Sequence, residues 1–284
     1  MTATKLDTWE EAVQWLRQQP DQQKLVFDAY YDDPILQAAE RYWRSGEWSA
    51  IRKFLPQAPG TAVDIGAGRG IASYALAKEG FEVTALEPDA SDLVGAGAIR
   101  ELSNEAHLSI SIAEEFSEKL PFPDHAFDVV FARAVLHHTS DLSAACREFF
   151  RVLKPGGRFI AVREHVISSE RDLPIFLDRH PLHKLYGGEN AFLLNDYRNS
   201  IVSAGFKMDR LLTPFESEIN FAPYTPEELK TEIGARIGMR LPLVAKATQV
   251  LLDIRAVWAI FSRAAANFDH RPGRLYSFVA TRPL

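Results

Sequence analysis

The chain of 284 residues has little cysteine and no excess of basic charge. Its one cysteine, Cys146, cannot form an internal disulfide framework or a thiolate metal cluster, so both are excluded and a reducing cytoplasm is favoured. Lys and Arg number 32 against 38 Asp and Glu, which gives a formal charge of -6. Because neutralising many phosphates requires a broad excess of basic residues, we expect no nucleic-acid partner.

Long uninterrupted apolar runs are also lacking. Residues 1–16 include acidic side chains and no apolar run followed by a small-residue cleavage site, which is unlike a signal peptide. The most apolar late stretch, residues 241–261, contains Lys246, Asp253 and Arg255, which are unfavourable in a hydrocarbon layer. We therefore expect helix there, no transmembrane segment, and a cytoplasmic protein.

The 46% of hydrophobic residues suffices for a large buried core. Helical spacing of apolar residues over 8–55 predicts an amino-terminal helical cap, residues 1–58. Over residues 59–284, short β-branched runs alternate with helical patterns, which predicts an α/β domain with a doubly wound, mostly parallel sheet. The expected strands cover residues 61–65, 81–86, 108–112, 127–132, 158–162, 207–213 and 275–281.

Two expected helices have recognisable first residues. Asp141 is placed to cap a helix whose apolar residues lie on one face, and Cys146 beside that face is expected to be a small core residue. Thr225 followed by Pro226 has the form of a second helix start. It opens a helical insertion, at about residues 224–266, before the last strand.

A glycine-rich turn, residues 63–70, joins the first expected strand to a helix beginning near Ile71. Glycine lets the backbone pass close beneath a ligand, and the carboxyl end of a parallel strand is where open α/β sheets bind ligands. The dinucleotide fingerprint would need glycine at position 71, and here the third glycine is Gly70. The spacing is therefore compatible with a ligand that has no pyrophosphate in this turn.

Glu87 ends the second expected strand. A carboxylate at this place can accept hydrogen bonds from both hydroxyls of a ribose, each contributing about 1.5–3 kcal/mol. A solvated acid at a strand end is the alternative for Glu87 alone. After the glycine turn, the ribose role is favoured.

The glycine turn and Glu87 are followed by Leu-Pro-Phe-Pro-Asp at 120–124, Phe-Asp-Val-Val at 127–130 and Leu-Lys-Pro-Gly-Gly at 153–157. In this order, the set resembles the motifs of class I S-adenosylmethionine-dependent methyltransferases over residues 60–165. The resemblance implies a Rossmann-like sheet of seven strands whose last strand is antiparallel. It also implies S-adenosylmethionine as the methyl donor and S-adenosylhomocysteine as the product.

The resemblance assigns the glycine turn to the methionine part of the donor and Glu87 to its ribose. It places an acid that contacts the adenine amine just after the third strand, which here favours Glu114 over a backbone group. A surface acid is the alternative, since extra residues precede Leu120. The expected cofactor-binding residues are Asp64, Gly66, Ala67, Gly68, Gly70, Glu87, Pro88, Glu114 and Arg133. Asp64 is expected to orient the turn or to meet the donor's amino group through water, and Arg69 to project into solvent.

The acceptor side is expected beyond the fourth strand, where His137 and His138 are candidate catalytic bases. A structural role is the alternative for both histidines. The sequence has no Asn-Pro-Pro-Tyr tetrad at this strand and no Pro-Cys pair, which in related enzymes serve adenine or glutamine amines and pyrimidine rings. Those acceptors are therefore disfavoured.

Three further segments are candidates for the acceptor pocket. Residues 180–190 are expected to form a lid that contacts substrate, but His180 and His183 supply too few ligands to predict a metal site. The aromatic residues of the cap, such as Tyr30 and Tyr31, are expected to cover the donor or simply to pack. Residues 241–261 are expected to form an entrance for a lipid-like acceptor, an oligomer contact or a helical cover.

The sequence as a whole predicts methyl transfer from S-adenosylmethionine to a small or medium-sized metabolite. A noncatalytic methyltransferase-like binding module is the main alternative. A nicotinamide-dependent oxidoreductase shares the expected fold but conflicts with Ile71. The oligomeric state is not predicted.

Overall fold

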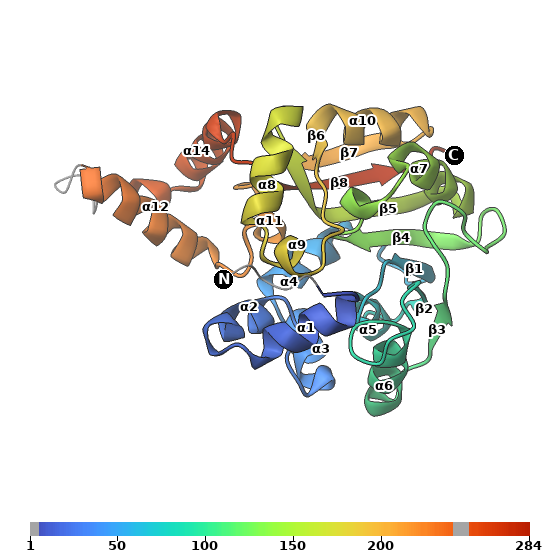
Figure 1. Cartoon of the computed structure of the whole chain (residues 1–284). Helices are drawn as coiled ribbons and strands as arrows, with labels where there is room; N and C mark the ends of the chain where they lie inside the picture. The colour runs from blue at the N-terminus through green and yellow to red at the C-terminus, as the bar shows by residue number, and fades with distance from the viewer. Residues whose placement is uncertain (1–5, 241–249) are drawn as a thin grey trace.

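The computed structural model describes residues 6–240 and 250–284 (Figure 1). A central sheet has the strand order β3-β2-β1-β4-β5-β8-β7, and a short strand β6 pairs with β5 off this path. The strands are β1 (Thr61–Ile65), β2 (Glu82–Leu86), β3 (Ile110–Ala113), β4 (Phe127–Arg133), β5 (Leu153–Ile167), β6 (Phe192–Leu193), β7 (Lys207–Leu212) and β8 (Arg274–Thr281).

The predicted sheet is confirmed. Strands β1 to β5 pair in parallel, whereas β8 runs antiparallel to both β5 and β7. Two differences lie in β5 and β6. Strand β5 begins at Leu153, so the Lys-Pro-Gly-Gly segment belongs to the strand, and the two residues of β6 are too few to produce an alternating pattern.

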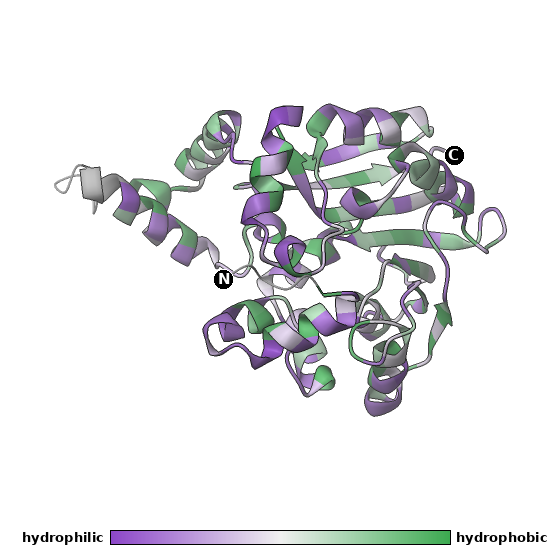
Figure 2. Ribbon diagram, in the orientation of Figure 1, coloured by the Kyte–Doolittle hydropathy of each residue, from purple (hydrophilic) through white to green (hydrophobic). Residues whose placement is uncertain are grey.

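Helices cover both faces of the sheet, as a doubly wound fold requires. One buried cluster joins sheet residues to α7 (Leu142–Val152) and α10 (Leu194–Ser203), and another joins them to α5 (Ile71–Lys78) and α6 (Ala96–Ala106). Figure 2 shows hydrophobic residues concentrated along the strands and hydrophilic residues on the outer turns of the helices. Strands β1 and β4 are mostly apolar and mostly buried, apart from residues such as Asp64 and Asp128, because both of their faces are covered.

The two predicted helix starts are confirmed. The Asp141 carboxylate accepts the Ala144 N–H at 2.8 Å at the start of α7, and Cys146 is buried in the core below. At the start of α12 (Pro226–Arg240), Thr225 and Glu228 form a reciprocal capping box.

The amino-terminal segment is helical, as predicted. It contains α1 (Trp9–Gln18), α2 (Gln23–Asp28), α3 (Ile35–Trp43) and α4 (Gly46–Ile51), with 3-10 turns at Pro20–Gln22 and Arg52–Phe54. Tyr42 and Trp48 are fully buried in the same cluster as sheet residues, and Trp48 packs on Phe131 of β4 with ring centroids 6.0 Å apart. The later helices of the cap therefore form part of the domain core. The boundary at residue 58 stays a prediction.

Two helical insertions follow β5 and β7. The first contains a 3-10 turn (Glu170–Asp172), α8 (Leu173–Arg179) and α9 (Pro181–Leu185). The second contains α11 (Glu218–Phe221), α12 and α14 (Arg255–Phe268), and Figure 1 shows α12 and α14 extending away from the sheet. Of the apolar run 241–261, residues 241–249 lie outside the described residues, and the described part is largely helical. Within the described ranges, the molecule has no helix with the length and apolarity of a membrane span.

We predict that Trp48→Ala destabilises the protein by about 3–5 kcal/mol. The substitution removes a fully buried indole that packs on Tyr42 and Phe131 and donates a hydrogen bond to Glu79 at 3.1 Å. Urea denaturation followed by circular dichroism measures the free energy of unfolding. Trp15→Ala is the matched control, because Trp15 is 40% exposed and its loss should change that free energy by less than about 1 kcal/mol. Equal effects of the two substitutions would contradict a cap that shares the sheet's core.

Candidate functional site

A cavity of about 760 Å³ opens at the carboxyl ends of β1, β2 and β4. Its walls come from the glycine turn after β1, the end of β2, the segment after β3, the segment after β4, the cap, and residues 186–189 after α9. This edge is where parallel α/β sheets bind ligands, because the strand ends and the loops that follow them meet there. The size lies in the range of small-molecule sites.

The glycine turn adopts left-handed backbone at Gly66, Gly68 and Gly70, with φ of 60°, 54° and 79°. A β-carbon at Gly66 would lie 2.8 Å from the Val135 side chain. At Gly68 it would meet only the carbonyl of Val94, at 3.8 Å, so this glycine faces open space in the cavity wall. The requirement for glycine at position 66 therefore comes from the chain itself, not from a ligand beneath the turn.

Glu87 lies where the sequence predicts it, at the cavity. One carboxylate oxygen accepts the Gly68 N–H at 2.7 Å and the other accepts the Asp89 N–H at 2.9 Å. Burial raises the pKa of Glu87, and the two N–H groups act against that rise. Each oxygen keeps lone-pair capacity for a further donor, so the carboxylate can both hold the turn and accept ligand hydroxyls.

Asp64 is buried behind the turn and also borders the cavity. Its carboxyl accepts the Ser73 hydroxyl at 2.6 Å, which links β1 to the first turns of α5. Burial raises the pKa of Asp64 to about 7, so the folded chain retains a proton that an exposed aspartate would release. The expected role of orienting the turn stays a prediction.

Arg69 is buried, and the expectation that it projects into solvent is wrong. Its guanidinium donates to the carbonyl oxygens of Tyr30 and Asp32 and forms an ion pair with Asp33, all in the loop between α2 and α3. These partners lie more than thirty residues upstream, so no local pattern indicates them. Arg69 thereby attaches the cap to the glycine turn and brings Tyr30 and Tyr31 into the cavity wall.

Arg133 borders the cavity, but its charge is already paired. Its guanidinium donates to both carboxylate oxygens of Glu47, at 2.6 and 3.1 Å. Glu47 is 2% exposed and lies 3.7 Å from Arg163. Although burial opposes ionisation, the two guanidinium groups hold the pKa of Glu47 below its ordinary value. Sequence reasoning did not identify Glu47, because its partners lie more than eighty residues away.

Glu114 does not border the cavity, so the described contacts do not support the prediction that it contacts the donor's adenine. Its carboxylate forms an ion pair with Arg100 of α6 and is directed to the surface. Four residues that follow β3 border the cavity instead: Glu115, Phe116, Ser117 and Glu118. The loop between β3 and β4 is long, spanning residues 114–126, and its first turn comes at residues 117 and 118.

The two candidate bases have different surroundings. His137 is 1% exposed and does not border the cavity, and its Nδ1 lies 2.7 Å from Glu164. Burial holds the pKa of His137 well below its ordinary value. His138 borders the cavity, and its Nδ1 lies 3.0 Å from the Gly188 carbonyl. Of the pair, only His138 can reach a molecule in the cavity directly.

The expected lid also contributes to the wall. Tyr186, Gly187, Gly188 and Glu189 border the cavity. Of the remaining predicted residues, Ala67 and Pro88 border it, whereas Gly70, as the residue before α5, does not. Fold and site together are those of a Rossmann-like α/β protein with a cavity of small-molecule size at the carboxyl edge of its sheet.

Comparison with known proteins agrees with this definition. A family model described as a methyltransferase domain matches residues 63–161. An uncharacterised methyltransferase, YcgJ, of Bacillus subtilis is 32% identical over 43% of this chain and 49% of its own length. A ubiquinone/menaquinone biosynthesis C-methyltransferase of Nitrobacter hamburgensis is 28% identical over 46% of this chain and 53% of its own length. The chain thus spans about half the length of these curated relatives.

Two solved structures have the same fold. The [4+2]-cyclase SpnF superposes with a TM-score of 0.55 at 20% identity, covering 87% of this chain and 82% of the cyclase. The structure of YcgJ from Bacillus subtilis gives 0.53 at 19% identity, covering 84% and 98%. Over residues 63–161 these matches support the resemblance to class I S-adenosylmethionine-dependent methyltransferases, and the solved structures show the same fold.

We predict that Asp64→Asn changes how stability depends on pH. With a pKa of about 7 in the folded chain and 3.8 as the ordinary value, Asp64 stays protonated when folded and ionises when unfolded between pH about 4 and about 7. Its contribution to the free energy of unfolding therefore falls as pH rises through this window and then levels off. An asparagine does not titrate and lacks this fall. Urea denaturation of both proteins at intervals from pH 4.5 to 8.5 measures the free energy of unfolding. The wild type should lose stability relative to Asp64→Asn as pH rises. Parallel profiles would contradict the raised pKa of Asp64.

Proposed function

We propose that the chain transfers the methyl group of S-adenosylmethionine to a small or medium-sized metabolite by in-line displacement. One observation carries the proposal: the turn N–H of Gly68 and the carboxylate of Glu87 share a hydrogen bond in the wall of a cavity that continues to His138 and Glu189. A donor held at the first two residues would thus face a space bordered by the last two. The methyltransferase-domain match over residues 63–161 and the methyltransferase names of the relatives support the donor's identity.

The donor fits the residues at its expected end of the cavity. Glu87 has acceptor capacity for the ribose hydroxyls, and the open face at Gly68 leaves room for the methionine part of the donor. The aromatic residues Tyr30 and Tyr31 supply apolar and ring surfaces from the cap side. Arg133 is occupied by Glu47, so we assign it to organising the wall rather than to binding the donor directly.

Catalysis would rest mainly on positioning. The sulfonium already makes the methyl group a strong electrophile, so the protein has to align a nucleophile and exclude water. Orientation of this kind is worth about 7–11 kcal/mol, whereas a general base adds about 10²–10⁴-fold. His138 is the base candidate, because a proton on Nδ1 shared with the Gly188 carbonyl leaves Nε2 free to accept another.

The acceptor is proposed to be a small molecule. A net charge of -6 disfavours a polyanion, and the cavity lies within the size range of small-molecule sites. The quinone-biosynthesis name of one relative points the same way. A methyl-release assay over a broad panel of metabolites tests this step. Turnover with one class supports it, and donor binding with no turnover across the panel would favour a noncatalytic binding module.

We predict that Glu87→Gln weakens S-adenosylhomocysteine binding by about 10–100-fold, because a charged acceptor contributes about 1.5–3 kcal/mol per hydrogen bond. Isothermal titration calorimetry measures the change. Glu114→Gln is the matched control, since Glu114 is paired with Arg100 outside the cavity. This variant should bind S-adenosylhomocysteine as tightly as the wild type does. A wild type that binds NADH and not the donor's product would overturn the proposal. Equal losses in the two variants would place the adenosine elsewhere.

A further inference from the structure

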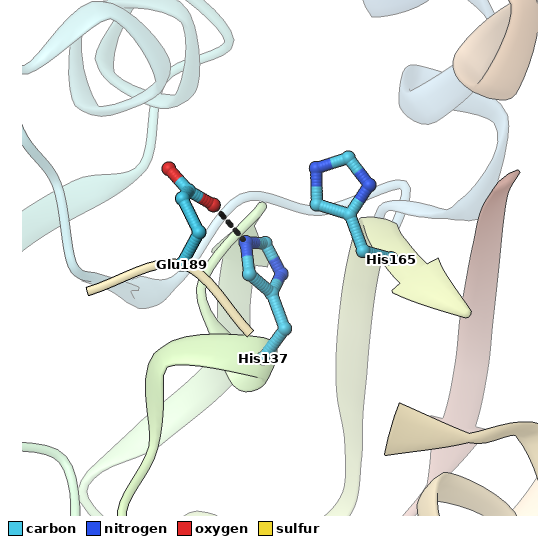
Figure 3. A group of neighbouring side chains, drawn as sticks. All are labelled: His137, His165 and Glu189. Atoms are coloured by element: carbon cyan, nitrogen blue, oxygen red, sulfur yellow. Dashed lines mark ion pairs between the residues drawn. The ribbon is translucent and has the colours of Figure 1, made fainter. Parts of the chain in front are cut away.

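Three metal-ligating side chains meet beside the cavity, each from a different segment. His137 lies in the 3-10 turn after β4 (Leu136–His138), His165 lies in β5, and Glu189 lies in the loop after α9. Each offers one ligand atom, and these atoms all lie within 4.8 Å of one another. Figure 3 shows the His137 ring and the Glu189 carboxylate directed toward each other, with the His165 ring alongside. Glu189 also borders the cavity.

Both histidines have their second nitrogen fixed by an acceptor. His137 Nδ1 lies 2.7 Å from a Glu164 carboxylate oxygen, and His165 Nδ1 lies 2.8 Å from the Gly273 carbonyl. Because a carbonyl only accepts, the His165 proton is on Nδ1, and the carboxylate favours the same tautomer for His137. The Nε2 lone pairs are then available as ligands. Metal-binding histidines are oriented in this manner in proteins.

The described neighbours of the Glu189 carboxylate are imidazole rings, not cationic side chains that would compensate its charge. It is 9% exposed and lies 3.7 Å from His137 Nε2, 3.9 Å from His138 Nε2 and 3.7 Å from His180 Nδ1. Among the described residues, no Lys or Arg forms an ion pair with it. A carboxylate in such surroundings is poorly compensated unless a cation joins it.

One of these imidazoles has a ring nitrogen without another partner. His180 Nδ1 is buried and has no hydrogen-bond partner among the described residues. An uncompensated carboxylate and an unpartnered ring nitrogen thus face each other 3.7 Å apart.

We propose that His137, His165 and Glu189 bind a divalent transition-metal ion of the Zn²⁺ type, with His180 as a further ligand. Imidazole with carboxylate suits such ions better than Mg²⁺ or Ca²⁺. Ligand atoms around tetrahedral zinc lie about 3.4 Å apart for bonds of about 2.1 Å. The 3.7 Å between His137 and Glu189 therefore needs little closing, and the three ligand atoms, all within 4.8 Å of one another, must draw together by at most about 1.4 Å. The sequence analysis predicted no metal site, because the three segments meet only in the fold.

A metal at this place would have a definite use if the chain is a methyltransferase. Because Glu189 borders the cavity, an ion bound to it can take an acceptor oxygen as an additional ligand and lower the pKa of that hydroxyl. The acceptor class would then be a molecule with an ionisable or chelating oxygen. This use rests on the proposed function, whereas metal binding does not.

Metal-free full-length protein, dialysed against a chelator, is titrated with Co²⁺ under an absorption spectrometer and with Zn²⁺ in a calorimeter. We expect one ion per chain, visible d–d bands from Co²⁺ bound to nitrogen and oxygen, and loss of those bands on adding Zn²⁺. Zn²⁺ should also raise the melting temperature, since it binds only the folded chain tightly. Absence of binding by both ions overturns the site.

Two variants assign the ion to these residues. Glu189→Gln and His165→Gln should each weaken Zn²⁺ binding at least tenfold and abolish the rise in melting temperature, whereas His270→Gln removes an exposed histidine and should change neither. If one variant does not fold, the other decides. Wild-type affinity in both cluster variants would place the ion elsewhere and overturn the proposal. A calorimetric titration of the metal-free protein with S-adenosylhomocysteine tests the donor site separately.

Discussion

The hydrogen bond between the Gly68 N–H and the Glu87 carboxylate is the contact on which the site depends. Strands β1 and β2 are parallel and in register, with Ile65 opposite Leu86, so the turn and the acid leave the sheet at the same level. The 2.7 Å bond then joins the two strand ends across one wall of the cavity. Without this bond, the Gly68 N–H of the turn would be unpaired. The buried Glu87 carboxylate would also lose one of its two N–H donors.

The cap is attached to this arrangement by buried charges. Arg69 follows Gly68 directly and binds the loop before α3, and Arg133 at the end of β4 binds Glu47 of α4. The Glu47 carboxylate is buried, so breaking its pair with Arg133 leaves an uncompensated buried charge, whereas Asp33, the partner of Arg69, is 57% exposed. The cavity wall therefore includes the amino-terminal segment as a structural part of the site. A segment that reads from the sequence as a separate cap completes the binding cavity.

The sequence predicted the features that local patterns determine. Residues 61–65 and 127–132 are mostly apolar strands covered on both faces, and Asp141 caps its helix through an N–H only three residues away. Glu87 was predicted because a strand end has a defined place in a parallel sheet. The antiparallel last strand followed from the resemblance to a family, since strand order depends on long-range pairing.

Contacts between distant segments could not be predicted in this way. Arg69 has the composition of a surface residue, and its partners in the loop before α3 become visible only once the chain is folded. Glu114 was predicted from spacing, but the path of the loop after β3 pairs it with Arg100. Glu189 lies in the segment 180–190 that the sequence predicts as a lid, yet nothing local indicates that it meets His137 and His165. In each case the deciding partner lies on another element.

The central claim is that an adenosyl group binds between the glycine turn and Glu87. A crystal structure of the protein with S-adenosylhomocysteine tests it most directly. The account predicts both ribose hydroxyls within hydrogen-bond distance of the Glu87 carboxylate and the sulfur directed toward the space bordered by His138 and Glu189. Ligand density away from residues 66–68, or a Glu87 carboxylate that makes no contact with the ribose, would contradict it.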